Sequence, residues 1–203
     1  MTRQIKPVQD NNDKCQTFAY WKSRYKLAMN YGFYVEALVI DYALLEDRLK
    51  SFLFHIGVFN TRKSYKADNK KVKPDLYKIL TFNHEKNELR VNSIQGKITI
   101  VRSVLKWCSE TEGAEGKYQC ALKTQCESLD IGECLAVLDE IDCWRGYRNE
   151  VMHALINKNL ESLDENIKLQ AEKGMQLANR LDNQIKILKK GNRIRKALNL
   201  QNG

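Results

Sequence analysis

The chain has 203 residues, with 34 Lys and Arg, 25 Asp and Glu, and a formal net charge of +9. This length suits a single domain with its own hydrophobic core and argues against two separate domains. Its longest apolar runs, such as 37–40, are far shorter than the roughly 20 residues that a membrane span requires, and the N-terminus has no apolar signal core. We therefore expect a cytoplasmic protein that does not contact a membrane.

The spacing of the apolar residues predicts an all-α fold. Only two prolines and ten glycines interrupt the chain, whereas a sheet would need more turn signals. Residues 1–12 are polar, and we expect them to form a disordered N-terminus. A first helix is predicted from Asp13, which caps it, to about Asn30, with Gly32 as its stop. A second helix is predicted over 37–56.

The central part of the chain alternates loops and helices. Residues 58–73 predict a long basic loop, and loops of this length in compact domains are often functional or disordered. Pro74 is expected to open the next helix. Further helices are predicted over 93–107 and 118–126, separated by a loop over 112–116.

A capping pattern marks the start of the following helix. Asp130 is followed three residues later by Glu133, which is the spacing of a capping box. The apolar pattern then continues to about Leu155, and residues 157–159 are expected to form a tight turn.

The last predicted helix carries an apolar stripe over 160–188, with steps that alternate between three and four residues. This stripe either covers the domain's own bundle or meets a second copy of the chain. The sequence therefore predicts one bundle of four or more helices over 13–190, with a long C-terminal helix and a basic tail over 191–203.

The positive charge is concentrated in two segments. Residues 61–73 hold six basic residues against the single acid Asp68, and residues 186–196 hold six against none, so the rest of the chain is nearly neutral. Such concentration favours a polyanion partner. A solvated segment that keeps the protein soluble explains either run alone equally well.

The six cysteines contain no C-x-x-C pair, which predicts reduced thiols. A zinc site made of Cys120, Cys126 and Cys134 is an alternative, but these spacings match no compact ligand motif. We expect these cysteines to be small core residues, and we expect neither a metal nor a cofactor.

The densest group of chemical residues lies at 148–153. On a helix, Asn149 and His153 lie four residues apart, while Arg145 and Arg148 follow an adjacent strip, so the polar groups can face one cleft. A histidine suits proton transfer near neutral pH, and the guanidinium of an arginine can bind two phosphate oxygens. These residue types suit cleavage of RNA through attack by the 2′-hydroxyl, which needs no metal.

One histidine cannot easily serve as both acid and base in a single concerted step. The other two histidines, His55 and His84, have no adjacent Arg or Asn. A second imidazole is therefore expected from a second chain, which predicts a homodimer.

A structural interpretation of the same residues competes with catalysis. An Arg and a His five residues apart occur by chance on many helices, as surface groups or as a satisfied His beside the core. The flanking apolar residues suit a core better than a base-stacking platform; they are Trp144, Tyr147, Val151 and Leu155. Glu46 and Asp47 are expected to be solvated.

The motif Arg148-Asn149-Glu150-Val151-Met152-His153 resembles the signature of the HEPN (higher eukaryotes and prokaryotes nucleotide-binding) superfamily, in which an Arg and a polar residue are followed by three residues and a His. The helix over 34–50 is similar to the family's preceding helix, which often has an Ala-Leu-Glu-like stretch. The resemblance loosely covers residues 33–188.

This resemblance implies a bundle of helices and a metal-independent endoribonuclease that acts as a dimer, in toxin–antitoxin, abortive-infection or other antiviral defence. Arg148 would bind the scissile phosphate, His153 would be the acid or base, and Asn149 a supporting polar group. An antitoxin or another regulator is the implied protein partner. Members paired with nucleotidyltransferase antitoxins usually place a tyrosine two residues after the histidine, where this chain has Leu155, so that mode of regulation is not expected.

In this interpretation the two basic segments supply contacts to RNA phosphates. The residues expected to bind RNA are Arg145, Lys70, Lys71, Lys73, Lys189, Lys190, Arg193 and Arg195. The alternative functions are a non-catalytic bundle that binds RNA or nucleotides and a helical module that docks a protein through the stripe over 160–188.

Overall fold

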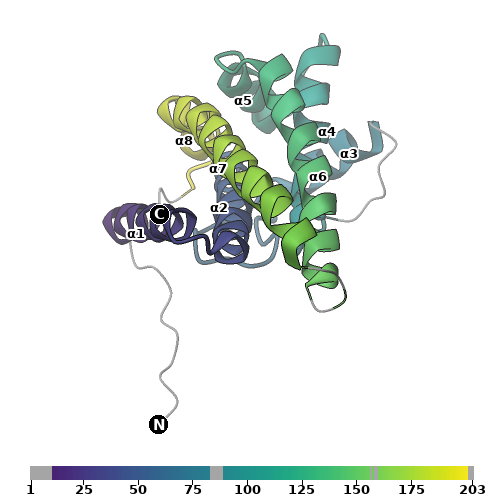
Figure 1. The fold of residues 1–203 in the computed structure, drawn as a ribbon. Coiled ribbons are helices and arrows are strands. Elements are labelled where there is room, and N and C mark those ends of the chain that lie inside the picture. Colours follow the sequence, from purple (N-terminus) through teal and green to yellow (C-terminus); the bar gives the residue numbers. More distant parts are fainter. Residues whose placement is uncertain (1–10, 83–88, 156, 158–159, 201–203) are drawn as a thin grey trace.

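The computed structural model describes residues 11–82, 89–155, 157 and 160–200, and within these ranges every regular element is a helix (Figure 1). The predicted all-α fold with a long C-terminal helix is confirmed. None of the described helices is long and apolar enough to cross a membrane. The helices, in chain order, are α1 (Asn11–Asn30), α2 (Tyr34–His55), α3 (Lys73–Phe82), α4 (Ile94–Glu110), α5 (Gly116–Cys126), α6 (Ile131–Ala154), α7 (Leu160–Gly191) and α8 (Arg193–Ala197).

Glycines end the first two helices where the sequence predicts. Gly32 follows α1 with φ 75°, and Gly57 follows α2 with φ 84°, which are left-handed conformations that glycine adopts without steric strain. Helix α1 begins at Asn11, two residues before the expected cap at Asp13. The predicted disorder of 1–12 otherwise falls on residues 1–10, which lie outside the described ranges.

Side-chain caps fix the starts of α4 and α6. The hydroxyl of Ser93 accepts a hydrogen bond from the backbone N–H of Gly96 at 3.1 Å. The carboxylate of Asp130 accepts one from the N–H of Glu133 at 2.9 Å, as the capping pattern predicts. Glu133 does not complete the reciprocal bond, because its carboxylate binds the guanidinium of Arg180 on α7 at 2.8 Å.

The long helix α7 packs along α2 and α6, and Figure 1 shows it crossing the front of the molecule beside α6. The apolar side chains of its stripe are buried from residue 167 onward: Ile167, Ala171, Ala178, Leu181, Ile185 and Leu188. The stripe therefore covers the chain's own bundle. For these residues, the alternatives in which it docks a second copy or another protein are wrong.

A glycine allows α7 to approach its neighbours closely. A Cβ atom at Gly174 would lie 2.7 Å from the Asp41 carboxylate of α2 and 2.7 Å from the Trp144 ring of α6. The carboxyl of Asp41 is fully buried, and neither of its oxygens has a hydrogen-bond partner. Burial raises the pKa of Asp41 to about 9, so this group is protonated at neutral pH.

The C-terminal segment also packs onto the domain. Ile194 and Arg195 of α8 are buried, although the sequence predicts a tail over 191–203. The Arg195 guanidinium donates to the carbonyl of Phe54 at 3.1 Å, and the Gln125 amide donates to that of His55 at 3.4 Å. These bonds satisfy carbonyls at the end of α2 that have no partner within the helix. Residues 201–203 lie outside the described ranges.

Replacing Gly174 with Ala is expected to lower the free energy of unfolding by about 1–3 kcal/mol, because the added methyl group overlaps buried atoms of two helices. Gly146→Ala is the matched control, since a Cβ atom there meets nothing within 4 Å. The control is expected to gain about 0.5–1 kcal/mol from helix propensity. Urea denaturation of both variants measures the difference, and equal effects would contradict the tight contact at Gly174.

The buried carboxyl predicts a pH dependence of stability. The pKa of Asp41 is raised in the folded state by burial, so the folded protein keeps a proton that the unfolded chain loses above about pH 4. This contribution to stability is present in full below that pH and declines as the pH rises to about 9. In denaturation curves between pH 4 and 9, Asp41→Asn is expected to lose less stability with rising pH than the wild type does. Parallel pH profiles would show that Asp41 is ionised in the fold.

Candidate functional site

The predicted cluster lies in the last turns of α6. Trp144 and Val151 of this helix are buried, which confirms that they belong to the core. Arg148 and Asn149 are half-buried, and His153 is exposed in the final turn. The motif is therefore helical, with its apolar residues inside and its imidazole in solvent.

Arg148 has no carboxylate within ion-pair distance among the residues that the structure describes. Its guanidinium carbon lies 4.5 Å from the centre of the Tyr42 ring of α2. Nη1 lies 3.4 Å from the Asn149 amide oxygen, and Nε is buried without a hydrogen-bond partner. A cation stacked on an aromatic ring is held in place while its charge stays uncompensated.

Arg145 differs from Arg148 in this respect. Its guanidinium donates two hydrogen bonds to one oxygen of Asp142, at 3.1 and 2.9 Å. The same carboxylate lies 4.0 Å from Arg102 of α4. Arg145 therefore belongs to an ion-pair group between α4 and α6, and its charge is already balanced.

The two acids of α2 that were expected to be solvated are ion-paired. Glu46 binds the ammonium of the buried Lys97 at 2.7 Å. Asp47 lies 2.9 Å from Lys14 and also binds Arg48. Burial alone would raise the pKa of Asp47, but these two cations lower it. Both acids stabilise contacts between helices.

The two basic segments, which lie far apart in the sequence, meet in the fold. The Lys71 ammonium donates to the carbonyl of Leu198 at 3.2 Å. Arg195 donates to the carbonyls of Phe59 and Asn60, at 3.0 and 2.7 Å. The two segments therefore lie next to each other in the fold, and we call residues 61–73 and 186–196 together the basic face.

Most of the residues predicted to bind RNA are accessible on the basic face. Lys73 is half-buried, and the others that project into solvent are Lys70, Lys71, Lys189, Lys190 and Arg193. Arg195 does not fit the prediction, because its side chain is only 1% exposed and its guanidinium donates to backbone carbonyls. Its role in the fold is to join α8 to the end of α2.

An exposed aromatic residue of the basic face was not predicted. Tyr65 is 76% exposed, and the ammonium of Lys50 lies 4.4 Å from the centre of its ring. Aromatic side chains beside cations are platforms on which single-stranded bases stack. The signal in the sequence is an aromatic residue inside a basic run.

The cysteines proposed as alternative zinc ligands do not form a site. Cys126 and Cys134 are buried in the core, as expected, while Cys120 is exposed. The described residues contain no group of three or more His, Cys, Asp or Glu side chains that could hold a metal ion.

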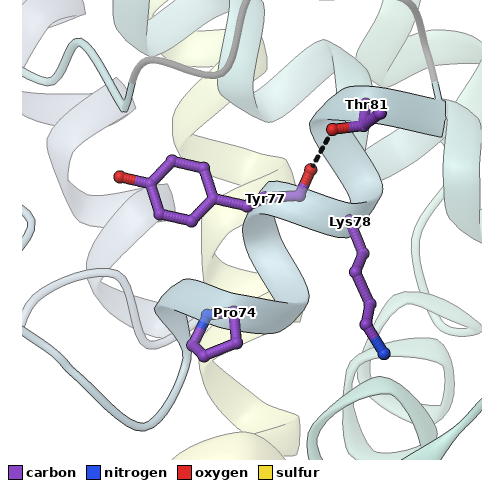
Figure 2. Close-up of a pocket in the computed structure, with 4 residues that line it drawn as sticks. All are labelled: Pro74, Tyr77, Lys78 and Thr81. Atoms are coloured by element: carbon purple, nitrogen blue, oxygen red, sulfur yellow. Dashed lines mark hydrogen bonds between the residues drawn. The ribbon is translucent and has the colours of Figure 1, made fainter.

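A hollow on the outer side of α3 contains none of the predicted site residues. Figure 2 shows its lining, which is Pro74, Tyr77, Lys78 and Thr81. The Thr81 hydroxyl donates to the carbonyl of Tyr77 at 2.9 Å, and Lys78 lies 3.7 Å from Glu115. The hollow is open, and all its residues come from one helix, so we assign no function to it.

The exposure of His153 predicts that it contributes little to stability. His153→Ala is expected to change the free energy of unfolding by less than about 0.5 kcal/mol, as is usual for surface positions. Val151→Ala on the same turn is the control, and loss of its buried methyl groups should cost roughly 2 kcal/mol. Thermal melting of both variants tests this, and a clear loss of stability in His153→Ala would favour a structural role.

No protein-family model, curated protein or solved structure matches this chain. The HEPN resemblance therefore depends on the motif over 148–153 and the helix over 34–50. The arrangement of these residues in the fold is the basis for inferring a function.

Proposed function

We propose that this chain is a metal-independent endoribonuclease of the HEPN type. The observation that carries this proposal is the guanidinium of Arg148, which stacks on Tyr42 and has no counter-ion among the described residues. The exposed imidazole of His153 follows it by five residues on the same helix. Structural arginines of the same bundle, such as Arg145 and Arg180, bind carboxylates. An arginine without a counter-ion, five residues before a solvent-exposed histidine on the same helix, suits a phosphodiester substrate.

Each residue has a separate role in the proposed reaction. The 2′-hydroxyl of one nucleotide attacks the adjacent phosphorus, and the bond to the 5′-oxygen of the next nucleotide breaks. Arg148 binds the phosphate oxygens and stabilises their growing negative charge. His153 transfers a proton, either from the attacking hydroxyl or to the leaving oxygen. Asn149, whose amide oxygen lies 3.4 Å from Arg148 Nη1, orients the guanidinium.

The second proton-transfer group is proposed to come from a second copy of the chain. His55 is buried and lies on α2 rather than on α6, so it cannot supply this group in the same chain. A homodimer that brings two copies of the α6 terminus together would place two imidazoles at one RNA strand.

The basic face supports RNA as the substrate class. It combines exposed lysines from two segments with the exposed ring of Tyr65. Lysine contacts to phosphates give affinity that does not depend on sequence, and a stacked ring adds affinity for unpaired bases. Single-stranded RNA fits this surface better than a duplex.

The biological role that accompanies this activity is a cytoplasmic toxin or antiviral effector. Cleavage of cellular RNA by such a protein requires control, so an antitoxin or another regulatory partner belongs to the proposal. Leu155, in the position where related toxins carry a modified tyrosine, points to control by binding rather than by modification at that position.

A second candidate function is RNA binding without cleavage. The proximity of the two basic segments favours it, because lysine contacts to phosphates give affinity for RNA without any catalytic group. An endoribonuclease cleaves the RNA and loses that activity in His153→Ala, whereas a protein that only binds RNA shows no cleavage in either form.

The test is incubation of the purified protein with end-labelled single-stranded RNA in excess EDTA. We expect cleavage products that end in a 2′,3′-cyclic phosphate. His153→Ala should reduce the rate by roughly 100-fold or more, since a general acid or base contributes about that much. Arg148→Ala should reduce it comparably, through loss of phosphate stabilisation.

Arg145→Ala is the matched control, because it removes an arginine from the same helix whose charge is already balanced by Asp142. It should cleave at nearly the wild-type rate. RNA that is bound but stays intact across a broad panel of sequences would favour the non-catalytic function.

A further inference from the structure

A second group of cations surrounds His55 at the end of α2. His55 is 4% exposed, and its Nδ1 atom is buried without a hydrogen-bond partner. Burial, followed by the charges of Arg62, Lys189, Arg195 and Lys14, lowers the pKa of His55 to about 3. The imidazole is therefore neutral and retains a ring nitrogen that forms no hydrogen bond with any described residue.

Two guanidinium groups share the ring of Phe54 beside this histidine. The guanidinium carbon of Arg62 lies 4.5 Å from the ring centre, and that of Arg195 lies 3.9 Å from it. Arg195 donates to the carbonyls of Phe54, Phe59 and Asn60, which explains its position. Arg62 has no comparable contacts, and its Nε atom is buried without a hydrogen-bond partner.

The nearby acids are engaged elsewhere. Asp47 binds Lys14 and Arg48. Asp68 accepts a hydrogen bond from the backbone N–H of Asn60 at 2.8 Å and another from the Ser64 hydroxyl at 2.7 Å. In the described part of the chain, neither Arg62 nor Lys189 lies within ion-pair distance of a carboxylate.

This arrangement is electrostatically incomplete. Charges in partly buried positions are normally paired, because the loss of water around them is costly. Here the half-buried, unpaired Arg62 and an unused imidazole nitrogen adjoin a buried arginine, and the exposed Lys189 lies near enough to act on His55. A negatively charged group that accepts hydrogen bonds would satisfy all of them at once.

We propose that Arg62, Lys189 and the Nδ1–H of His55 bind a phosphate group, held between the end of α2 and the basic face. The planar fork of Arg62 contacts two phosphate oxygens, Lys189 contributes a point charge from the exposed rim, and the neutral imidazole donates one hydrogen bond. The phosphate belongs either to a nucleotide or to an RNA backbone, which present the same chemistry.

This site is separate from the cluster of α6 and does not depend on RNA cleavage. His55 follows Tyr42, the contact of Arg148, by 13 positions on α2. At the rise of an α-helix this separation is about 20 Å along the axis, and the two side chains lie on different sides of the helix. One phosphate cannot contact both sites.

The experiment is calorimetric titration of the full chain carrying His153→Ala, so that RNA is not cut while binding is measured. The probes are inorganic phosphate, adenosine monophosphate and a single-stranded RNA oligonucleotide, with sodium chloride at equal ionic strength as the reference. Arg62→Gln is expected to weaken phosphate binding at least tenfold. Lys66→Gln, an exposed lysine of the same loop, is the matched control and should change it less than twofold.

Lys189→Gln is the second variant. Its side chain is exposed, so this substitution leaves the fold intact even if the half-buried Arg62 is needed to hold the loop. A weakening of phosphate binding of about threefold to tenfold is expected. A nuclear magnetic resonance shift of the His55 ring nitrogens on addition of phosphate would show the ligand at this site. A purely structural role of the cluster produces no such shift.

The three probes distinguish the sources of the phosphate. Binding of inorganic phosphate and adenosine monophosphate indicates a nucleotide site, whereas binding of RNA alone indicates a backbone contact. Either result supports the proposal when Arg62→Gln or Lys189→Gln weakens the binding of that probe. Absence of binding in all arms, or affinities that neither variant changes, would overturn it.

Discussion

The packing of α7 against α2 and α6 is the constraint on which the rest of the structure depends. The absence of a side chain at Gly174 lets the three helices meet, with Asp41 and Trp144 against its backbone. This contact fixes α6 relative to α2, and so Arg148 can stack on Tyr42 while His153 stays in solvent. The Asp41 carboxyl at this junction is buried, protonated and without a hydrogen-bond partner. The close packing of the three helices therefore stabilises the fold by more than this unsatisfied carboxyl costs.

A second constraint acts at the other end of α2. The last carbonyls of this helix, those of Phe54 and His55, accept hydrogen bonds from Arg195 and Gln125, and the carbonyl of the next residue, Ile56, accepts one from Tyr118. Gln125 also accepts a bond from the backbone N–H of Ile194 at 2.9 Å, which ties α8 to α5. The hydrogen bonds that complete the end of α2 therefore also bring the two basic segments together. The need of a helix terminus for hydrogen-bond donors thus places positive charges from distant parts of the sequence next to each other.

Sequence patterns predicted the helices well, because turn glycines, caps and apolar spacing are local signals. The capping of α6 by Asp130 and the stops at Gly32 and Gly57 are examples. The contacts that each arginine makes in the fold were harder to predict. The pairing of Arg145 with Asp142 could have been inferred from their spacing of three, but the stacking of Arg148 on Tyr42 and the burial of Arg195 depend on helices that meet only in the folded chain.

The docking of α8 has a thermodynamic consequence for any polyanion that spans the basic face. Such a ligand would contact residues of both basic segments, so docking of α8 would raise its affinity. By reciprocity, the bound ligand would stabilise the docked C-terminal segment by the same amount. The hydrogen bonds of Arg195 to Phe59 and Asn60 would then act as a coupling between the end of the chain and the loop after α2. A protein that pulled α8 away would divide the basic face into two weaker halves.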